Sequence, residues 1–451
     1  MIGSRVRHMA TYGAAVGLSA GLVLTGLSVT TASASGTPGV TAGQVTIGAT
    51  VPLTGIASPG YNEVAKAANA VFRYINTKPG GKINGRTINY VLKDDCYGTP
   101  GFGCTGTPNT ATQTNALLAL PVFATVGSLG TPTQDSVRAT LKANGTPQLF
   151  VNSGSKDWNN PGTYPGLFGY QPSYNVESKV LAKYIKATYG SQKVCFLGQN
   201  DDFGLDGHQG LVTGGVNPAP ADTKYYNVVN YVISGSAYIK PFVQGFKTDA
   251  CKVVFLDTIP AVTAGVLASA KSLTFAPHWV ISSVGSDPIT VNNVLKGKGT
   301  ETGAISFAPL AASTDTNKNA KLWKTWMTKV LVKDKADFPK FTASSPIDGN
   351  MAYGIGFGVA FAEALKAAGT NFTQSSFVHL LETTTFAQTP SLLPLKYSAS
   401  NHQGLLGGYI IKIASTKSTS PINQTVYVTD NGGGAVTVSG SRSAGIPSWL
   451  S

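Results

Sequence analysis

The sequence is poor in charged residues, and the few that it has are scattered. Only 12% of its residues are charged, with 34 lysines and arginines against 21 acids, so the formal net charge is +13. A positive excess can indicate a nucleic-acid partner, but this chain has no basic run that would neutralise a row of phosphates. We therefore expect no nucleic-acid partner and attribute the charge to the surface of the protein.

Histidine and cysteine are also scarce, and their spacing argues against a metal or cofactor site. The four cysteines form no CxxC motif, and no histidine lies close to them, so a zinc site is not expected. No HExxH pair and no strand-linked glycine loop for a dinucleotide is present. We expect no metal, no cofactor and no catalytic residue. The histidines are dispersed at His8, His208, His278, His379 and His402.

Long apolar runs are confined to the amino terminus. Arg5 and Arg7 precede an apolar stretch at residues 10–29, and "TASASG" then places small residues at Ala32 and Ala34. This pattern predicts a secretory signal peptide, cleaved near Ala34 to leave a secreted chain. An uncleaved membrane anchor is the alternative, because the stretch is long enough to span a bilayer. No cysteine lies near the cut, so no lipid anchor is expected.

An exported chain meets oxidising conditions, in which an even number of cysteines favours disulfides. Cys96 and Cys104 lie in "DDCYGTPGFGCTG", where glycine and proline allow the chain to double back. Cys195 and Cys251 belong to the apolar runs "KVCFLG" and "CKVVFLD", and a bridge between them is feasible if these runs are neighbours in one sheet. We predict the disulfides Cys96–Cys104 and Cys195–Cys251.

From Val45 onward, short apolar runs alternate with helix-length segments, which is typical of parallel sheets covered by helices. The runs of the first half are "VTIGATV", "RTINYVL", "VFATVG" and "QLFVN". After an interruption at residues 164–175, the alternation restarts with "KVCFLG", "YYNVVNYVI", "CKVVFLD" and "HWVISS". The repetition predicts two α/β lobes, each a doubly wound parallel sheet.

Ligands of parallel sheets bind beyond the carboxyl ends of the strands, so the residues at these ends are the candidate binding residues. Those of the first lobe are hydroxyls and helix starts, which suit a carboxylate or another small anion. Those of the second lobe are mainly acidic or aromatic, and a tyrosine lies near the crossover between the lobes. The candidate ligand-binding residues are Thr54, Thr131, Ser153, Ser155, Tyr174, Asp202, Phe203, Asp257 and Ser283.

Several of these residues also have a purely structural interpretation. Thr54, Thr131 and Ser155 are suitable helix caps, and Tyr174 is a suitable packing residue. The pair Asp94–Asp95 is better placed to fix the cysteine loop than to contact a ligand.

One motif points to an enzyme, and it is weak. "SGSK", Ser153 to Lys156, matches the S-x-x-K of serine acyl-transferring enzymes. That chemistry needs a helix here, and the following "DWNNPG" opposes one. "NDDFGLDG" lacks the alternation and the terminal glutamate of a calcium loop.

Taken together, several segments resemble the extracytoplasmic solute-binding proteins of branched-chain amino-acid ABC uptake systems. The resemblance covers nearly the whole mature chain and rests on "VTIGATVPLTG", "INGRTINYVLKDD", "VGSLGTPTQDSV", "PQLFVNSGSKDW", "YQPSYNVESKVLAKYI", "QNDDFG" and "VVFLD". It implies the type I periplasmic-binding-protein fold, in which two lobes joined by crossing strands close around the ligand. The implied division is a signal peptide at 1–34, lobe 1 at 35–169 and 304–398, lobe 2 at 170–303, and a lobe 2 ribbon with a loose tail at 399–451.

The resemblance also implies roles for individual residues. Thr131, Ser153 and Ser155 would hold a ligand carboxylate, and Phe203 would pack on the ligand. The family's amino-acid binders place an acid after the last strand of the second lobe, where this chain has Ser282 and Ser283 in "VISSVGSD". Either Asp257 or Asp202 compensates, or the ligand has no ammonium group.

The sequence thus predicts a secreted, monomeric and non-enzymatic protein that captures a small polar ligand, such as an amino acid, an amide or a small carboxylate. An ABC transporter permease is the expected partner. The alternatives are a stand-alone secreted sensor of the same fold and a serine hydrolase that uses Ser153 and Lys156.

Overall fold

The computed structural model describes residues 36–98, 104, 106 and 109–451. The expected signal peptide, its cleavage point and the alternative membrane anchor lie outside these residues. Within the described part, no helix is both long and apolar enough to cross a membrane. The residues from Thr37 to Ser451 form one unit by their contacts.

The first sheet is entirely parallel and has five strands in the order β2-β1-β3-β4-β5. Its strands are β1 (Gln44–Val51), β2 (Thr87–Asp94), β3 (Thr125–Val126), β4 (Gln148–Val151) and β5 (Leu167–Gly169). Its helices include α1 (Ser58–Thr77), α2 (Thr110–Leu118), α3 (Thr131–Asn144), α11 (Gly349–Ala368) and α12 (Gln374–Thr383). The strand order reverses between β1 and β3, and such a switch point opens a crevice for ligands.

The second sheet has eight strands in the order β15-β14-β13-β10-β9-β8-β6-β7. Its parallel part comprises β6 (Val194–Gln199), β7 (Thr223–Tyr226), β8 (Val253–Asp257), β9 (His278–Ile281) and β10 (Ile305–Ala308). The strands β13 (Gly407–Ser415), β14 (Ser418–Val428) and β15 (Thr437–Val438) add an antiparallel ribbon. The helices of this part are α4 (Tyr174–Tyr189), α5 (Asp202–Thr213), α6 (Val228–Ser234), α7 (Ser236–Thr248), α8 (Pro260–Ser272) and α9 (Pro288–Leu295).

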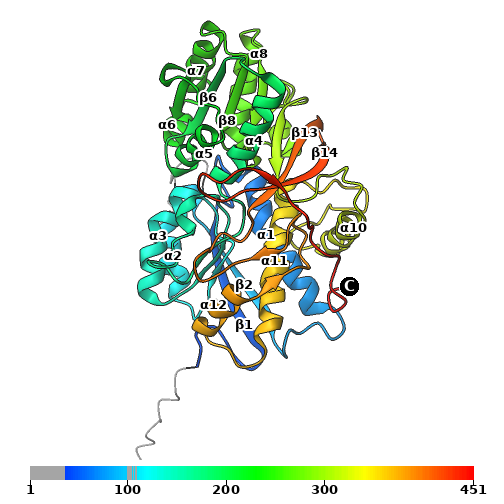
Figure 1. Ribbon diagram of the computed structural model, residues 1–451. Helices are drawn as coiled ribbons and strands as arrows, with labels where there is room; N and C mark the ends of the chain where they lie inside the picture. Colours follow the sequence, from blue (N-terminus) through cyan, green and yellow to red (C-terminus); the bar gives the residue numbers. More distant parts are fainter. Residues whose placement is uncertain (1–35, 99–103, 105, 107–108) are drawn as a thin grey trace, which may run out of the picture. The chain divides into compact units, whose positions relative to one another are not determined.

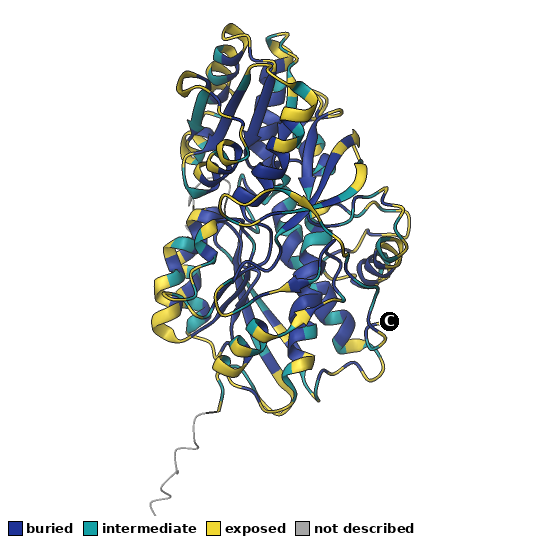
Figure 2. Ribbon diagram, viewed as in Figure 1, coloured by how far each residue is buried: buried dark blue, intermediate teal, exposed yellow. Residues whose placement is uncertain are grey.

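The apolar runs become strands because helices cover both faces of the sheets. All five residues of β8 are buried, for example, and Figure 2 shows the strands of both sheets as largely buried. Parallel strands covered on both faces need this continuous apolar character. The predicted α/β class with two doubly wound parallel sheets is confirmed.

One expected strand was wrong. Residues 225–233 divide into the end of β7 and helix α6, because Asn227 interrupts the run. Its side chain accepts a hydrogen bond from Asn230 N at 3.1 Å and so begins a helix.

The chain crosses between the two sheets more than once. It leaves the first sheet after β5, returns from β10 through α10 (Lys318–Lys333) to α11, and then enters β13 (Figure 1). Strand β10 belongs to the second sheet and begins just beyond residue 303, where we expected the first part of lobe 2 to end. The exact lobe boundaries stay a prediction.

The last residues are attached to the first part of the molecule, although we expected a loose tail. Trp326 Nε1 donates to Leu450 O at 3.1 Å, and Trp449 Nε1 donates to Glu363 Oε1 at 2.9 Å. Figure 1 shows this segment, in red, running back past α11. Leu450 is fully buried. The apolar side chains near the end of the chain, which the glycine- and serine-rich composition obscured, hold the tail in place.

We expect Leu450→Ala to lower the free energy of unfolding by about 2 kcal/mol, the lower end of the range for a buried leucine. Denaturant titration followed by circular dichroism measures this change. Leu322→Ala is the matched control, because Leu322 is 45% exposed. An equal effect of the two substitutions would mean that the tail does not pack in solution.

Candidate functional site

A cavity of about 450 Å³ lies at the switch point of the first sheet. The loop after β3 contributes Leu129, Gly130 and Thr131 to its wall, and the start of α5 contributes Phe203. The segment after β9 contributes Ser283 from the second sheet. Residues that follow strands of both sheets therefore line one cavity.

Three hydroxyl groups form a cluster at one end of this cavity, and we call Thr131, Ser153 and Tyr174 the hydroxyl cluster. Thr131 Oγ1 lies 2.7 Å from Ser153 Oγ and 3.1 Å from the Tyr174 hydroxyl. All three side chains are buried. Burial raises the pKa of Tyr174 well above its ordinary value, so that its hydroxyl stays protonated and can donate.

Helix α3 begins at the hydroxyl cluster and adds its positive end to it. Its cap residue Gly130 has a φ of 111° and provides no side chain to accept from the first N–H groups. A helix start without a side-chain cap leaves N–H donors available for an anion. The residues on this side of the cavity therefore favour a carboxylate or a similar anionic group.

The cysteine loop supplies a residue that the sequence did not single out. The predicted disulfide Cys96–Cys104 is present, and Tyr97, the residue after Cys96, lines the cavity. Tyr97 has a φ of 55°, and its N–H donates to Asp95 Oδ1 at 3.0 Å. The left-handed backbone at this residue left no signal in the sequence, because tyrosine rarely adopts it.

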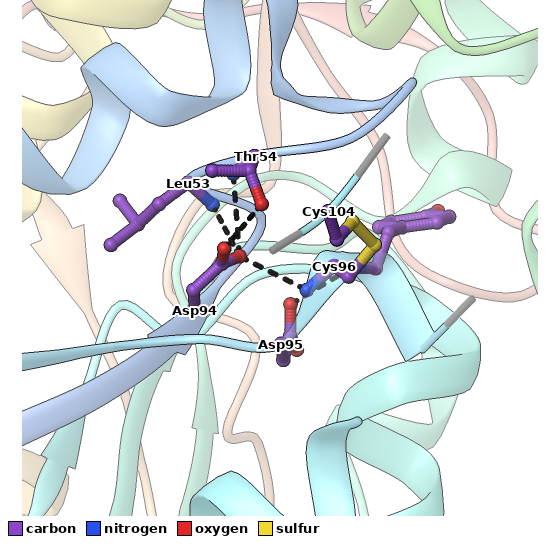
Figure 3. Close-up of a disulfide and its surroundings, with 7 residues drawn as sticks. Leu53, Thr54, Asp94, Asp95, Cys96 and Cys104 are labelled. Carbon is purple, nitrogen blue, oxygen red and sulfur yellow. Dashed lines mark hydrogen bonds between the residues drawn. A yellow bond between two sulfur atoms is a disulfide. The ribbon is translucent and has the colours of Figure 1, made fainter. Parts of the chain in front are cut away.

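Thr54 is engaged by the aspartate that ends β2 (Figure 3). Its hydroxyl donates to Asp94 Oδ2, and Asp94 Oδ1 accepts from Leu53 N at 3.0 Å and from Cys96 N at 3.1 Å. Asp94 thus ties the loop after β1 to the cysteine loop, as its interpretation as a loop-fixing residue predicted. Thr54 is not among the residues that line the cavity.

Ser155, like Thr54, forms a structural hydrogen bond within the protein. Its hydroxyl accepts from Asp157 N at 3.2 Å and caps a short 3₁₀ helix at Lys156–Trp158. Ser155 is 1% exposed and is not one of the lining residues of the cavity. Of the three residues that the resemblance assigned to a carboxylate, only Thr131 faces the cavity, while Ser153 lies directly behind it.

Aromatic rings meet beside the hydroxyl cluster. The ring centroids of Tyr174 and Phe203 are 4.5 Å apart, and both residues line the cavity. Phe203 is held there by Asp201, whose Oδ1 accepts from Phe203 N at 3.0 Å. Asp202, the next predicted residue, is half-buried at the start of α5 and does not line the cavity.

The predicted acid Asp257 lies beneath the site. It is 1% exposed at the end of β8, and a Cβ atom on Gly207 would collide with its carboxyl group. Burial, with the nearby carboxyl of Glu177, raises the pKa of Asp257 well above its ordinary value. Asp257 is therefore a buried residue beneath the cavity rather than a lining residue.

Ser283 lines the cavity, but an acid that the sequence did not single out holds it. Both its N–H and its hydroxyl donate to Glu177, the latter at 2.7 Å. Glu177 is fully surrounded by protein, and burial raises its pKa to about 7. Its position early in α4 is that of an ordinary helix residue, so no signal in the sequence distinguished it.

Two further acids on the cavity wall were missed. Asp287 Oδ1 accepts from Thr290 N and Oδ2 from Gly349 N, both at 2.8 Å. Asp348 Oδ1 accepts from Met351 N at 2.7 Å. Both cap helices, and the location of Asp287 in "VISSVGSD" was the available signal.

The geometry that a Ser–Lys hydrolase needs is not formed by the described residues. Ser153 bonds within the hydroxyl cluster, whereas Lys156 Nζ lies 2.7 Å from Asp206 Oδ1. The basic amine therefore neutralises Asp206 rather than activating Ser153.

Among the described residues, one group has the spacing of metal ligands, namely Cys195, Asp222 and Cys251. Its two sulfur atoms form the predicted disulfide Cys195–Cys251, and Asp222 pairs with Lys193 at 3.0 Å. With both thiols oxidised, this group offers no thiolate ligand.

Comparison with known proteins identifies the family. A family model described as periplasmic binding protein matches residues 44–418. No curated protein matches the chain. A fatty acid ABC transporter substrate-binding protein from Thermomonospora curvata is 16% identical with a TM-score of 0.71, and the alignment covers 88% of this chain and 95% of that one.

Two other solved structures are similar. A branched chain amino acid ABC transporter protein from Thermus thermophilus with bound valine is 15% identical with a TM-score of 0.67, covering 86% of this chain and 98% of that one. A solute binding protein of an ABC transporter from R. palustris in complex with 4-hydroxybenzoate is 12% identical with a TM-score of 0.63, covering 84% and 95%. At these identities the likeness shows the fold.

Proposed function

The chain belongs to the periplasmic binding protein family, and we propose that it captures a small carboxylate-bearing ligand between its lobes and delivers it to an ABC transporter. The family and the two disulfides fit an extracytoplasmic location. Secretion through the amino-terminal signal peptide and action as a monomer are part of the same proposal. The fold and family are those of binding proteins, and we propose that the chain has no catalytic activity.

The observation that carries the proposal is the hydroxyl cluster at the start of α3. The hydroxyls of Thr131 and Tyr174, with Ser153 behind them, and the helix N-terminus offer donors for one carboxylate inside a cavity that both lobes line. Valine, 4-hydroxybenzoate and a fatty acid, which are named for the three similar structures, share a carboxylate and little else. Closure of the lobes would bury this group and strengthen each charge-assisted hydrogen bond.

A sensor of the same fold is the second candidate. It would bind the same ligand in the same cavity without docking on a permease. Copurification with a permease complex in the presence of ligand distinguishes the two, because a sensor would not bind such a complex.

We expect Thr131→Ala to weaken ligand binding by about 1–2 kcal/mol, because one hydrogen bond to the carboxylate is lost. A thermal-shift screen of amino acids, amides and aliphatic and aromatic acids identifies a ligand, and calorimetry then measures its affinity. Thr131→Ser keeps the hydroxyl and should restore most of the affinity.

Thr140→Ala is the matched control, since Thr140 is exposed on the same helix. It should leave binding unchanged. Equal affinity of the wild type and Thr131→Ala would show that the carboxylate is held elsewhere. The same experiment on Ser155→Ala tests the role that the resemblance assigns to Ser155.

A further inference from the structure

The cavity continues from the hydroxyl cluster to a wall that is mainly apolar. This wall is built by the segments after β9 and β10, by α10, by the segment before α11 and by the ribbon of the second sheet. Its apolar members include Val284, Leu310, Trp323, Met327, Ile347 and Ile411. The indole nitrogen of Trp323 donates to Ala444 O at 3.1 Å, so that the ring presents only carbon to the cavity.

Two charged groups near this wall, Asp315 and Lys324, are already partnered by the protein, whereas the lining residues Lys321 and Lys417 are exposed. Asp315 Oδ2 accepts from the Tyr409 hydroxyl at 3.1 Å and from Arg442 Nη1 at 3.3 Å. Lys324 Nζ donates to Ser313 O at 2.9 Å, and Lys321 is exposed at the rim. The far part of the cavity therefore presents little that requires a polar ligand group.

The part of the cavity beside the hydroxyl cluster, in contrast, has a polar group that lacks a partner. Gln171 lines the cavity and is 7% exposed, and its Nε2 has no hydrogen-bond partner among the described residues. A buried amide without a partner costs free energy that a polar ligand group would recover. The two ends of the cavity thus differ in chemistry. One end presents hydrogen-bond donors, and the other presents apolar side chains.

The volume agrees with a ligand that occupies both ends. At about 450 Å³ the cavity lies within the range of roughly 300–1,000 Å³ typical of sites that enclose drug-sized molecules. A ligand as small as valine would fill the hydroxyl end and leave the apolar wall uncovered.

We infer that the ligand is an amphiphilic carboxylate, with its head on the hydroxyl cluster and an extended aliphatic or arylalkyl body along Leu310, Trp323 and Met327. This inference rests on the proposed function and narrows its substrate class. It agrees with the expected ammonium site, where Ser282 and Ser283 stand in place of an acid. The nearby Asp287 on the cavity wall already accepts from Thr290 N and Gly349 N.

The test is calorimetry with valine, butanoate, octanoate and dodecanoate below their micelle concentrations. Affinity should rise about fourfold for each added methylene until the apolar wall is covered. Ala311 also lines this wall, so that Ala311→Phe places a ring there and should weaken dodecanoate at least tenfold and butanoate much less. Ala367→Phe, at an exposed position of α11, is the matched control.

A second measurement does not depend on the Ala311→Phe variant. Dodecanoate should change the tryptophan fluorescence of the wild type, and Trp323→Phe should remove this change. Dodecanol, which lacks the carboxylate, should bind more weakly than dodecanoate.

The outcomes separate the inference from the proposed function. If short carboxylates bind in a Thr131-dependent way but affinity does not depend on chain length, the inference is overturned and the proposed function stands. If Lys321→Ala weakens dodecanoate and Thr131→Ala does not, the orientation is reversed and the inference is wrong. If no carboxylate of any length binds, both fail.

Discussion

Replacing Cys195 and Cys251 together by alanine is expected to lower the free energy of unfolding by about 4 kcal/mol. The two residues are 56 positions apart, and releasing so long a loop restores much chain entropy to the unfolded state. Both are buried, which adds a small loss of packing. Guanidinium titration of the double variant measures the change.

The ligand affinity of this variant should not change. Cys195 is the second residue of β6 and Cys251 precedes β8, so the bridge lies at the amino ends of these strands. The cavity lies beyond their carboxyl ends. A loss of affinity with intact stability would contradict the assignment of this disulfide to the fold alone.

The disulfide Cys96–Cys104 is the contrasting control. Its cysteines are only 8 positions apart, so its removal should cost about 2.5 kcal/mol. Tyr97 lies inside this loop and lines the cavity, and therefore ligand affinity should also fall. The two double variants are thus expected to separate stability from binding.

Much of the fold follows from the sequence because parallel strands need continuous apolar runs. The runs around Val45 and Val253 predicted strands β1 and β8, which are buried on both faces. The apolar run at 225–233 also predicted a strand, but most of it is helical, because the Asn227 side chain caps a helix there. A single capping residue is harder to recognise in a sequence than an apolar pattern, yet here it determined that α6 is a helix.

The site was predictable only where strand ends point into the cavity. Thr131 and Phe203 were found in this way. Thr54 and Ser155 are hydroxyl residues that follow a strand, as Thr131 is. Their hydroxyls, however, form hydrogen bonds with the Asp94 carboxylate and with the backbone N–H of Asp157. No property of the residues themselves distinguishes these two cases.

The apolar wall could not be predicted at all. Leu310, Met327 and Ile411 come from three distant segments, namely the segment after β10, helix α10 and strand β13. Only the return of the chain to both sheets brings them to one cavity. For this reason the strand ends alone do not indicate the amphiphilic ligand that we infer.

Glu177 is expected to make the protein less stable as the pH rises. Burial raises its folded pKa to about 7, whereas an unfolded glutamate has a pKa near 4.5. The native state therefore binds more protons than the unfolded state between these two values. Its contribution to stability is fully present below the unfolded pKa and is lost as the pH rises through the folded pKa.

Between about pH 5 and about pH 8 this contribution should fall by about 2.5 kcal/mol. Glu177→Gln keeps an acceptor for Ser283 and cannot ionise, so the variant should gain stability relative to the wild type over this range. Urea titration of both proteins at several pH values gives the difference, which isolates Glu177 from Asp95, whose pKa burial also raises to about 7. Parallel pH profiles would mean that Glu177 titrates normally, with its carboxyl group and Ser283 open to water.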